Sequence, residues 1–597
     1  MPVSESCRCM SIEAKDLYAS NNRINDPNGG YDIRTADGSY NLKKFTNTFD
    51  WSLDAIKLSE VYEKKIRRKD FAFRVGKYLY TKNVICVTFK YSYKEFNMAG
   101  RNTYVRDGYV YKDCVMNDGV CIVDGTLIAI QTNVEVQNPA PQEILGDYFI
   151  YEDGYYRQVG NIPTVKDKAG LREYLYQNGF RCDGVEYVRY KRSSGSSRVG
   201  KCLFVNKTLA DEMKKWDCCG LNIEDGQKID LAAWEAYISL PMSSIIDTIE
   251  IPLDSILIID DYNSEFEDDV VAVENVDNKL FSSQKKVVVK NSIFDGQSLM
   301  DKSLFGKYED KGMLLLRNRF FKSCCFNTNI QQWFEDNGIT SIEQLNGFTL
   351  ARHISQVKMI TTPSSIKYMK FGSVEQWLST VEPIFGVVKY EKKTHQFDGR
   401  MVQAHYQLFN TLQLSYEEME KVLAPSLKFI GDLRRDPAVL RYKIKYPDEI
   451  EDEEWAALDS KNEIIYKMLG INDAFCKTKL YYDFRDDLVN GELRNLKRGH
   501  VLVSGNYSTL MGNGFEMLKA SIGQFFGKSE LGTGNIHSKR FGYGKTLLCS
   551  RSPHVTMGNI LLVNNVENEE IDKYFNLTPE IVCVNAIGEN IQQRLNG

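Results

Sequence analysis

Residues 295–325 read DGQSLMDKSLFGKYEDKGMLLLRNRFFKSCC and are the most informative stretch of the chain. An Asp-Gly turn opens it, and a short apolar strand at 313–316 then leads into Arg317, Arg319 and Lys322. Because residues two apart in a strand share a face, Arg317 and Arg319 should point the same way. Clustered cations at a strand end suit a site that neutralises phosphate oxygens, although a solvated strand end with basic side chains gives the same pattern.

Cations follow turns at three other places. The segment TTPSSIKYMKF places Lys367 after a Ser-rich turn, and RYKRSSGSSRVGKCLF places Arg198 in a Ser/Gly loop. The segment RSPH holds Arg551 and His554 about a proline, which restricts the backbone on both sides of itself. Backbone N–H groups and hydroxyls in such loops contact phosphates. Each element alone also fits an ordinary solvated turn, but their recurrence in an acidic chain favours phosphate binding.

The order of strand and helix signals predicts a multidomain α+β fold. Strand patterns dominate residues 31–136, interrupted by one helix near 51–69. Short strands alternate with Gly and Ser turns over 285–371, helical periodicity fills 400–495, and strands return from 499.

Shifts in these patterns predict five segments. They are a β-rich accessory domain at 1–150, a mixed segment with the basic Ser/Gly loop at 151–284, a first barrel-like domain at 285–400, a helical connector at 401–495 and the start of a second barrel-like domain at 496–597. The acidic run at 260–269 is interpreted as a solvated loop, because no calcium-loop spacing accompanies it, and the run at 446–455 as another acidic surface segment.

Composition excludes several classes of protein. The 597 residues carry a formal charge of −5 and are 43% hydrophobic, which excludes a wholly disordered chain and a histone-like polycation. The sequence has no apolar run of the roughly 18–20 residues that a membrane span needs, so we expect a cytoplasmic protein without a membrane partner. The 14 cysteines include no C-x-x-C and are expected to be free thiols. Motifs for a P-loop, a nucleophile elbow, a zincin or a Rossmann site are missing from the sequence.

The ordered set of motifs resembles the two-barrel RNA polymerases, namely RNA-dependent RNA polymerases of the gene-silencing type and their single-chain relatives in phages and bacterial mobile elements. Arg317 and Lys322 stand at the family's Arg-to-Lys offset after its Asp-Gly segment, and TPSSIKY matches a family element with Lys367. The segment SGSSRVGKCLF supplies Arg198, and RSPHVTMGNI resembles a strand that follows later in the family. The resemblance covers residues 185–597.

Departures from the family pattern are also present. Arg319 and Phe320 replace glycines that follow the arginine in the family, and Asn559 stands where Asp is usual. The segment from Gly505 to Leu510 resembles another family element without its Asp.

The resemblance implies two double-psi β-barrel-like units joined by a helical connector, with the second barrel incomplete. It implies an RNA polymerase nucleotidyltransferase in which Lys322 and Lys367 act in catalysis by neutralising triphosphate charge. By the same resemblance, the residues that bind nucleic acid or nucleotide are Arg198, Arg317, Arg319, Arg551 and His554. The implied partners are an RNA or single-stranded template, nucleoside triphosphates and a second chain that carries catalytic aspartates.

The resemblance also implies Mg²⁺ held by an acidic D-x-D-G-D loop. The final segment GENIQQRLNG matches the approach to that loop, and the sequence contains no such aspartates. We therefore expect a truncated or split polymerase that is inactive alone, with a vacancy near Gly597 facing the two lysines, and an exposed apolar edge near 581–586. The alternatives are a non-catalytic nucleic-acid-binding protein on the same scaffold and an unrelated phage structural protein.

Overall fold

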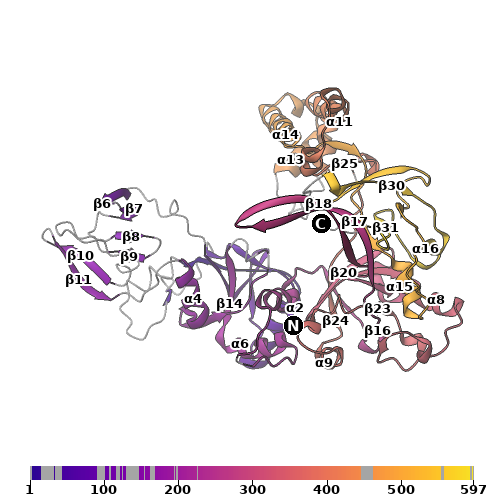
Figure 1. Ribbon diagram of the computed structural model, residues 1–597. Coiled ribbons are helices and arrows are strands. Elements are labelled where there is room, and N and C mark those ends of the chain that lie inside the picture. The colour runs from indigo at the N-terminus through magenta and orange to yellow at the C-terminus, as the bar shows by residue number, and fades with distance from the viewer. Residues whose placement is uncertain are drawn as a thin grey trace. The chain divides into compact units, whose positions relative to one another are not determined.

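The computed structural model of the chain divides into two compact units. Unit 1 comprises residues 1–249, 317–321 and 367–388, and unit 2 comprises the remainder of the chain (Figure 1). The residues that the structure describes are 3–14, 32–33, 44–89, 101–106, 109–115, 121–123, 126–128, 147–152, 155–161, 168–193, 195, 200–224, 226–394, 396–445, 461–552, 557–589, 591 and 595.

Unit 1 is built on a mixed eight-stranded sheet. Along the order β2-β12-β13-β14-β5-β1-β3, with β4 paired to β5, the strands are β2 (Asp32–Ile33), β12 (Phe180–Cys182), β13 (Val185–Arg189), β14 (Lys201–Asn206), β5 (Tyr78–Thr88), β1 (Cys7–Glu13), β3 (Asn47–Phe49) and β4 (Ala72–Val75). Three two-stranded ribbons are also described: β6 (Arg101–Arg106) with β7 (Tyr109–Val115), β8 (Cys121–Val123) with β9 (Thr126–Ile128), and β10 (Asp147–Glu152) with β11 (Tyr155–Asn161).

Strand β5 explains why this sheet is buried on both faces. Val84 and Cys86 join a core with helices α2 (Leu53–Ile66) and α6 (Lys207–Cys218), whereas Ile85 and Val87 join a second core on the other face. Alternate residues of a strand point to opposite faces, so an uninterrupted apolar run is what a doubly covered strand requires. The helix predicted near 51–69 is confirmed by α2.

Two further sheets have their strands in the orders β15-β24-β20-β21-β19-β23-β16-β22 and β27-β31-β28-β30-β29. The first contains β15 (Asp247–Glu250), β24 (Ile384–Tyr390), β20 (Met313–Asn318), β21 (Phe321–Thr328), β19 (Gln297–Asp301), β23 (Met359–Thr361), β16 (Ile256–Ile258) and β22 (Phe348–Thr349). The second contains β27 (Thr509–Gly512), β31 (Ile581–Val584), β28 (Asn535–His537), β30 (Ile560–Asn565) and β29 (Thr546–Ser550).

The two sheets repeat one pairing scheme. In the first, β16 runs parallel to β23, β23 antiparallel to β19, and β19 parallel to β21, which neighbours β20. In the second, β27 runs parallel to β31, β31 antiparallel to β28, and β28 parallel to β30, which neighbours β29. The chain also visits corresponding strands in the same order: β16, β19, β20, β21, β23 and β27, β28, β29, β30, β31. The fold is therefore mixed α+β and contains a topological repeat.

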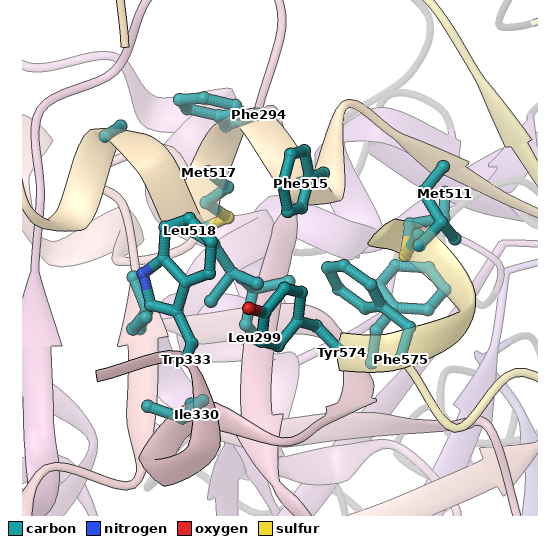
Figure 2. Close-up of a cluster of buried hydrophobic side chains, with 14 of the residues drawn as sticks. Phe294, Leu299, Ile330, Trp333, Met511, Phe515, Met517, Leu518, Tyr574 and Phe575 are labelled. Carbon is teal, nitrogen blue, oxygen red and sulfur yellow. The ribbon is translucent and has the colours of Figure 1, made fainter. Parts of the chain in front are cut away.

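A single hydrophobic core in unit 2 joins the two repeats (Figure 2). Leu299 of β19 contributes to it from the first repeat and Met511 of β27 from the second. Between them, Trp333 of α8 (Ile330–Asp336) meets Phe515 of α15 (Gly514–Ser521) edge to face at 5.4 Å and Tyr574 of α16 (Glu569–Tyr574) at 5.0 Å. Because their cores are continuous, we expect the repeats to fold as one unit.

The helix-rich region predicted at 400–495 is confirmed. It contains α10 (Tyr406–Thr411), α11 (Tyr416–Arg435), α12 (Pro437–Lys445), α13 (Lys461–Ile471) and α14 (Lys479–Lys497). A capping box at Ser415 and Glu418 starts α11, and Leu433, Leu440 and Phe484 lie in the core of this helical group. The acidic run at 446–455 lies outside the described residues.

Two expectations from the sequence are wrong. Most of the run at 260–269 is strand, because β17 (Asn263–Val276) pairs along its length with β18 (Lys279–Ser292) in the long ribbon of Figure 1. Two of its acids, Glu265 and Asp269, are opposite Lys290 and Lys286 across the ribbon, and the Glu265–Lys290 ion pair measures 3.2 Å. The segment near 581–586 is not an exposed edge either, since β31 is buried and paired on both sides, with β27 and β28.

The 12 cysteines whose side chains the structure describes are free thiols, as expected. Within the same residues, none of the helices combines the length and the apolar character that crossing a bilayer demands.

Candidate functional site

Lys322 and Lys367 are each fixed by a backbone hydrogen bond within their own unit. Lys322, in unit 2 near the start of β21, is exposed and donates its backbone N–H to the carbonyl of Ser365 at 3.0 Å. Lys367, in unit 1, opens a 3₁₀ turn (Lys367–Lys370), is half-buried and donates its N–H to the carbonyl of Phe320 at 2.7 Å. The backbone of each lysine is therefore held in place within its own unit.

A buried network of hydroxyl groups begins at Ser323, the residue that follows Lys322 on β21. The Oγ of Ser298 on β19 is 2.7 Å from the Oγ of Ser323 on β21 and 2.8 Å from Oγ1 of Thr361 on β23. Ser365 extends the network, since its Oγ lies 3.0 Å from that of Ser323. All four side chains are buried, so the network joins three strands where the lysine-bearing segments begin.

The turn before Lys367 is fixed by a second set of bonds. The Ser364 N–H donates to Oδ2 of Asp261 at 2.8 Å, and its hydroxyl lies 2.7 Å from that of Thr362 and accepts the Gly296 N–H at 3.2 Å. Gly296 has φ of +67°, a left-handed conformation that glycine adopts without strain. The Asp-Gly turn predicted from the sequence is present and contacts the Ser-rich turn of TTPSSIKY.

Arg317 and Arg319, which the resemblance assigned to nucleotide or nucleic-acid binding, are both buried. The guanidinium of Arg319 donates through Nη1 to the carbonyl of Trp216 at 2.8 Å and through Nη2 to the carbonyl of Thr380. Its carbon Cζ lies 5.0 Å from the centre of the Trp216 ring. These contacts give Arg319 a structural role within unit 1.

Phe320 occupies a position where the polymerases that the motifs resemble have glycine. It takes φ of +55°, a conformation that costs about 1–2 kcal/mol for a residue other than glycine. The side chain is fully buried and packs edge to face against Tyr368 at 5.4 Å and near Trp234 at 5.7 Å. Aromatic burial of this kind offsets the backbone strain.

The remaining site predictions are only partly within the described residues. Arg551 is exposed and follows β29. Arg198, His554 and Gly597 lie outside the described residues, so the predicted vacancy near the end of the chain is not described. The assignment of all seven residues to catalysis or binding stays a prediction.

The described residues do not fit the Mg²⁺ that the resemblance implies, since no group of three or more His, Cys, Asp or Glu side chains among them could hold a metal ion. A buried carboxylate of unit 2 has a different role: Glu391 accepts the N–H groups of Gly312 at 2.7 Å and Met313 at 3.0 Å and the hydroxyl of Thr578 at 2.9 Å. It therefore joins the start of β20 to the segment before β31.

Sequence reasoning missed the hydroxyl network and the basic groove described below. The signal for the network was a hydroxyl residue within each of three short apolar strands, QSLMD, FKSCCFNT and MIT. Hydroxyls that alternate with apolar residues are common on half-exposed strands, so only the pairing of the three strands reveals that these side chains meet.

Comparisons with known proteins returned a structural likeness alone. No protein-family model matches the sequence, and no curated protein matches it. Among solved structures, the chain is similar to the RNA-dependent RNA polymerase QDE-1 from Thielavia terrestris, with 13% identity and a TM-score of 0.45 over 73% of this chain and 46% of that one. The chain thus spans less than half of the length of the polymerase that it matches.

Proposed function

We propose that this chain is an RNA-polymerase-like protein that binds a single-stranded RNA template and nucleoside triphosphates. The observation that carries the proposal is the repeat of one strand-pairing scheme in two sheets around one core. Two related β units are the architecture that the motif resemblance implies, and Lys322 lies on β21 of the first repeat.

The proposed role of Lys322 and Lys367 is to neutralise phosphate charge. An ammonium group donates charge-assisted hydrogen bonds to phosphate oxygens, and such bonds are stronger when the donor is already positioned. The buried hydroxyls of Ser298, Ser323 and Thr361 support such positioning, because they hold the start of β21. Exposed Arg551 is proposed to contact the template or nucleotide as well.

In the polymerases that the motifs resemble, nucleotidyl transfer uses carboxylate-bound metal ions. We propose that these carboxylates come from residues that this sequence does not contain, for instance on a second chain, and that this chain alone binds RNA without extending it. The alternative is a non-catalytic RNA-binding protein on the same scaffold, for which no complementing chain would restore synthesis.

Two assays test the proposal. In titration calorimetry, ATP should bind more tightly than AMP, and Lys322→Ala or Lys367→Ala should reduce that preference about tenfold, corresponding to about 1.4 kcal/mol. In a primed-template assay with Mg²⁺, the chain alone should give no extension. Absence of both RNA and nucleotide binding would overturn the proposed function, and robust extension would overturn the proposal that the metal ligands lie elsewhere.

A further inference from the structure

A basic groove lies between helices α2 and α6 of unit 1. It encloses about 350 Å³ and is lined by Lys57, Glu60, Val61, Lys64, Lys65, Glu212, Lys215 and Trp216. All of these residues belong to unit 1. The motif resemblance does not involve this groove, and neither Lys322 nor Lys367 lines it.

Helical spacing forms both walls. Lys57, Val61 and Lys64 are four and three residues apart, so they share one face of α2. On α6, Glu212 and Trp216 are four residues apart and also share a face. The walls are fixed because α2 and α6 both pack on the sheet through the core that contains Val61 and Met213.

The charges of the groove are unequal, with four lysines against two glutamates. Lys57 is held by Glu382 at 2.7 Å, with Glu60 at 3.7 Å, and Lys65 lies 3.7 Å from Glu212. Among the described residues, no carboxylate lies within ion-pair distance of Lys64 or Lys215, and both are exposed. The groove therefore offers two cations that need an anionic partner.

Glu382 joins the two walls of the groove, because it binds one residue of α2 and one of α6. It accepts the indole N–H of Trp216 at 3.0 Å through one carboxylate oxygen and binds Lys57 through the other. Burial raises the pKa of the Glu382 carboxyl, but the hydrogen bonds from Lys57 and Trp216 outweigh it and hold the pKa below its usual value. The half-buried Trp216 ring, which the Arg319 guanidinium also contacts at 5.0 Å, is thereby held in place as part of the α6 wall.

We propose that this groove binds the phosphate backbone of single-stranded RNA, an inference that rests on the proposed RNA-binding function. Lys64 and Lys215 stand on the two different walls of the groove, α2 and α6. Successive phosphates of one strand that runs along the groove can contact both lysines. A single strand is therefore the ligand that we assign to the groove, and inorganic triphosphate is the competitor that tests this choice.

The test compares two double variants that remove the same charge. Lys64→Ala/Lys215→Ala removes the two groove cations, and Lys69→Ala/Lys214→Ala removes two exposed lysines close in sequence that do not line the groove. Binding of a fluorescent 12-nucleotide oligo(U) is measured by anisotropy at several salt concentrations. The groove variant should bind about tenfold more weakly at low salt, with a salt slope smaller by about 1.4, since each single-strand phosphate contact contributes about 0.7. The control variant should bind like wild type.

Several outcomes would overturn the inference. Equal losses of RNA affinity in both variants would show that the groove lysines contribute only general surface charge. If neither variant lost affinity, the groove would be excluded as an RNA site. Displacement of the oligonucleotide by low concentrations of inorganic triphosphate would indicate a nucleotide-phosphate site instead. If wild type binds RNA and only Lys322 and Lys367 variants lose affinity, the groove fails while the proposed function stands. If wild type binds no RNA, the groove inference fails, and the proposed function fails with it only if nucleotides are not bound either.

A crosslink provides an independent readout. Oligo(U) that contains 4-thiouridine should crosslink to peptides spanning 57–65 and 212–216. Crosslinks confined to other peptides would contradict the assignment even if the affinities followed the expected order.

Discussion

The side-chain amide of Gln297 forms two hydrogen bonds with the backbone of Gly512, which lies 215 residues further along the chain. The Gly512 N–H donates to Oε1 at 3.1 Å, and Nε2 donates to the Gly512 carbonyl. Gln297 begins β19 in the first repeat, whereas Gly512 ends β27 in the second. A single side chain thus pairs with both the N–H and the carbonyl of one buried residue in the other repeat, which adds a polar link to their common core.

Replacing Gln297 should therefore destabilise unit 2. Gln297→Leu leaves a buried N–H and a buried carbonyl unpaired, and the expected loss is about 2–4 kcal/mol of unfolding free energy. Denaturant unfolding measures it, with Gln332→Leu on the exposed face of α8 as the control, for which we expect less than about 0.5 kcal/mol. Equal effects of the two variants would show that the link is energetically unimportant.

At Phe320, the backbone and side chain have opposing effects on stability. Phe320→Ala should cost about 3–5 kcal/mol, because it empties an aromatic site and keeps a strained conformation. Phe320→Gly empties the same site but relieves the positive φ, so it should be less destabilising by about 1 kcal/mol. Thermal and denaturant unfolding of the two variants compares them directly. If Phe320→Gly were more destabilising than Phe320→Ala, the result would contradict backbone strain at residue 320.

Unit 1 contains a buried ionic cluster that sets a pH dependence. The ammonium of Lys191 donates to Asp54 at 2.8 Å, to Asp217 at 2.7 Å and to the carbonyl of Ile238 at 3.1 Å. The Tyr190 hydroxyl donates to Asp54 at 3.2 Å. Burial raises the pKa of Asp217 from 3.8 to about 7 despite the opposing charge of Lys191, and burial also raises the pKa of Asp54.

This cluster should make unit 1 less stable as pH rises. A carboxyl whose pKa is raised by folding binds its proton more tightly in the native state, so its contribution is complete below pH 3.8 and is lost as pH rises through 7. Unfolding free energy measured between pH 5 and 8 should fall, and Asp217→Asn should flatten that fall. Asp211→Asn, on the exposed part of α6, should leave the slope unchanged. A wild-type slope of the opposite sign would contradict the protonated cluster.

Local sequence patterns predicted most of the helices and strands, but they did not predict which strands pair with each other. Apolar runs such as VICVT and MLLL were sufficient to locate β5 and β20, and the Asp-Gly turn at Gly296 followed from residue type. The 263–269 part of β17 was missed because its acids resemble a solvated loop until the lysines of β18 are placed opposite them. Pairing between distant strands depends on contacts that a local pattern does not contain.

The candidate site shows the same limit. Cations beside turns selected Lys322 and Lys367, whose roles stay a prediction, and the same pattern also selected Arg319, which is buried against backbone carbonyls. A charge pattern cannot distinguish an arginine that binds a ligand from one that satisfies buried carbonyls. Lys64 and Lys215 were overlooked because they lie on different helices, 151 positions apart in the sequence, and only packing of α2 on α6 brings them to one groove.

The most direct test of the central claim is the affinity of the chain for single-stranded RNA with and without Lys322 and Lys367. A Lys322→Ala/Lys367→Ala variant is compared with Lys302→Ala/Lys428→Ala, which removes two other exposed lysines, both in unit 2. The account predicts that the first variant alone binds about tenfold more weakly, with a salt slope smaller by about 1.4. Affinities and slopes that are the same for both variants and for wild type would contradict it.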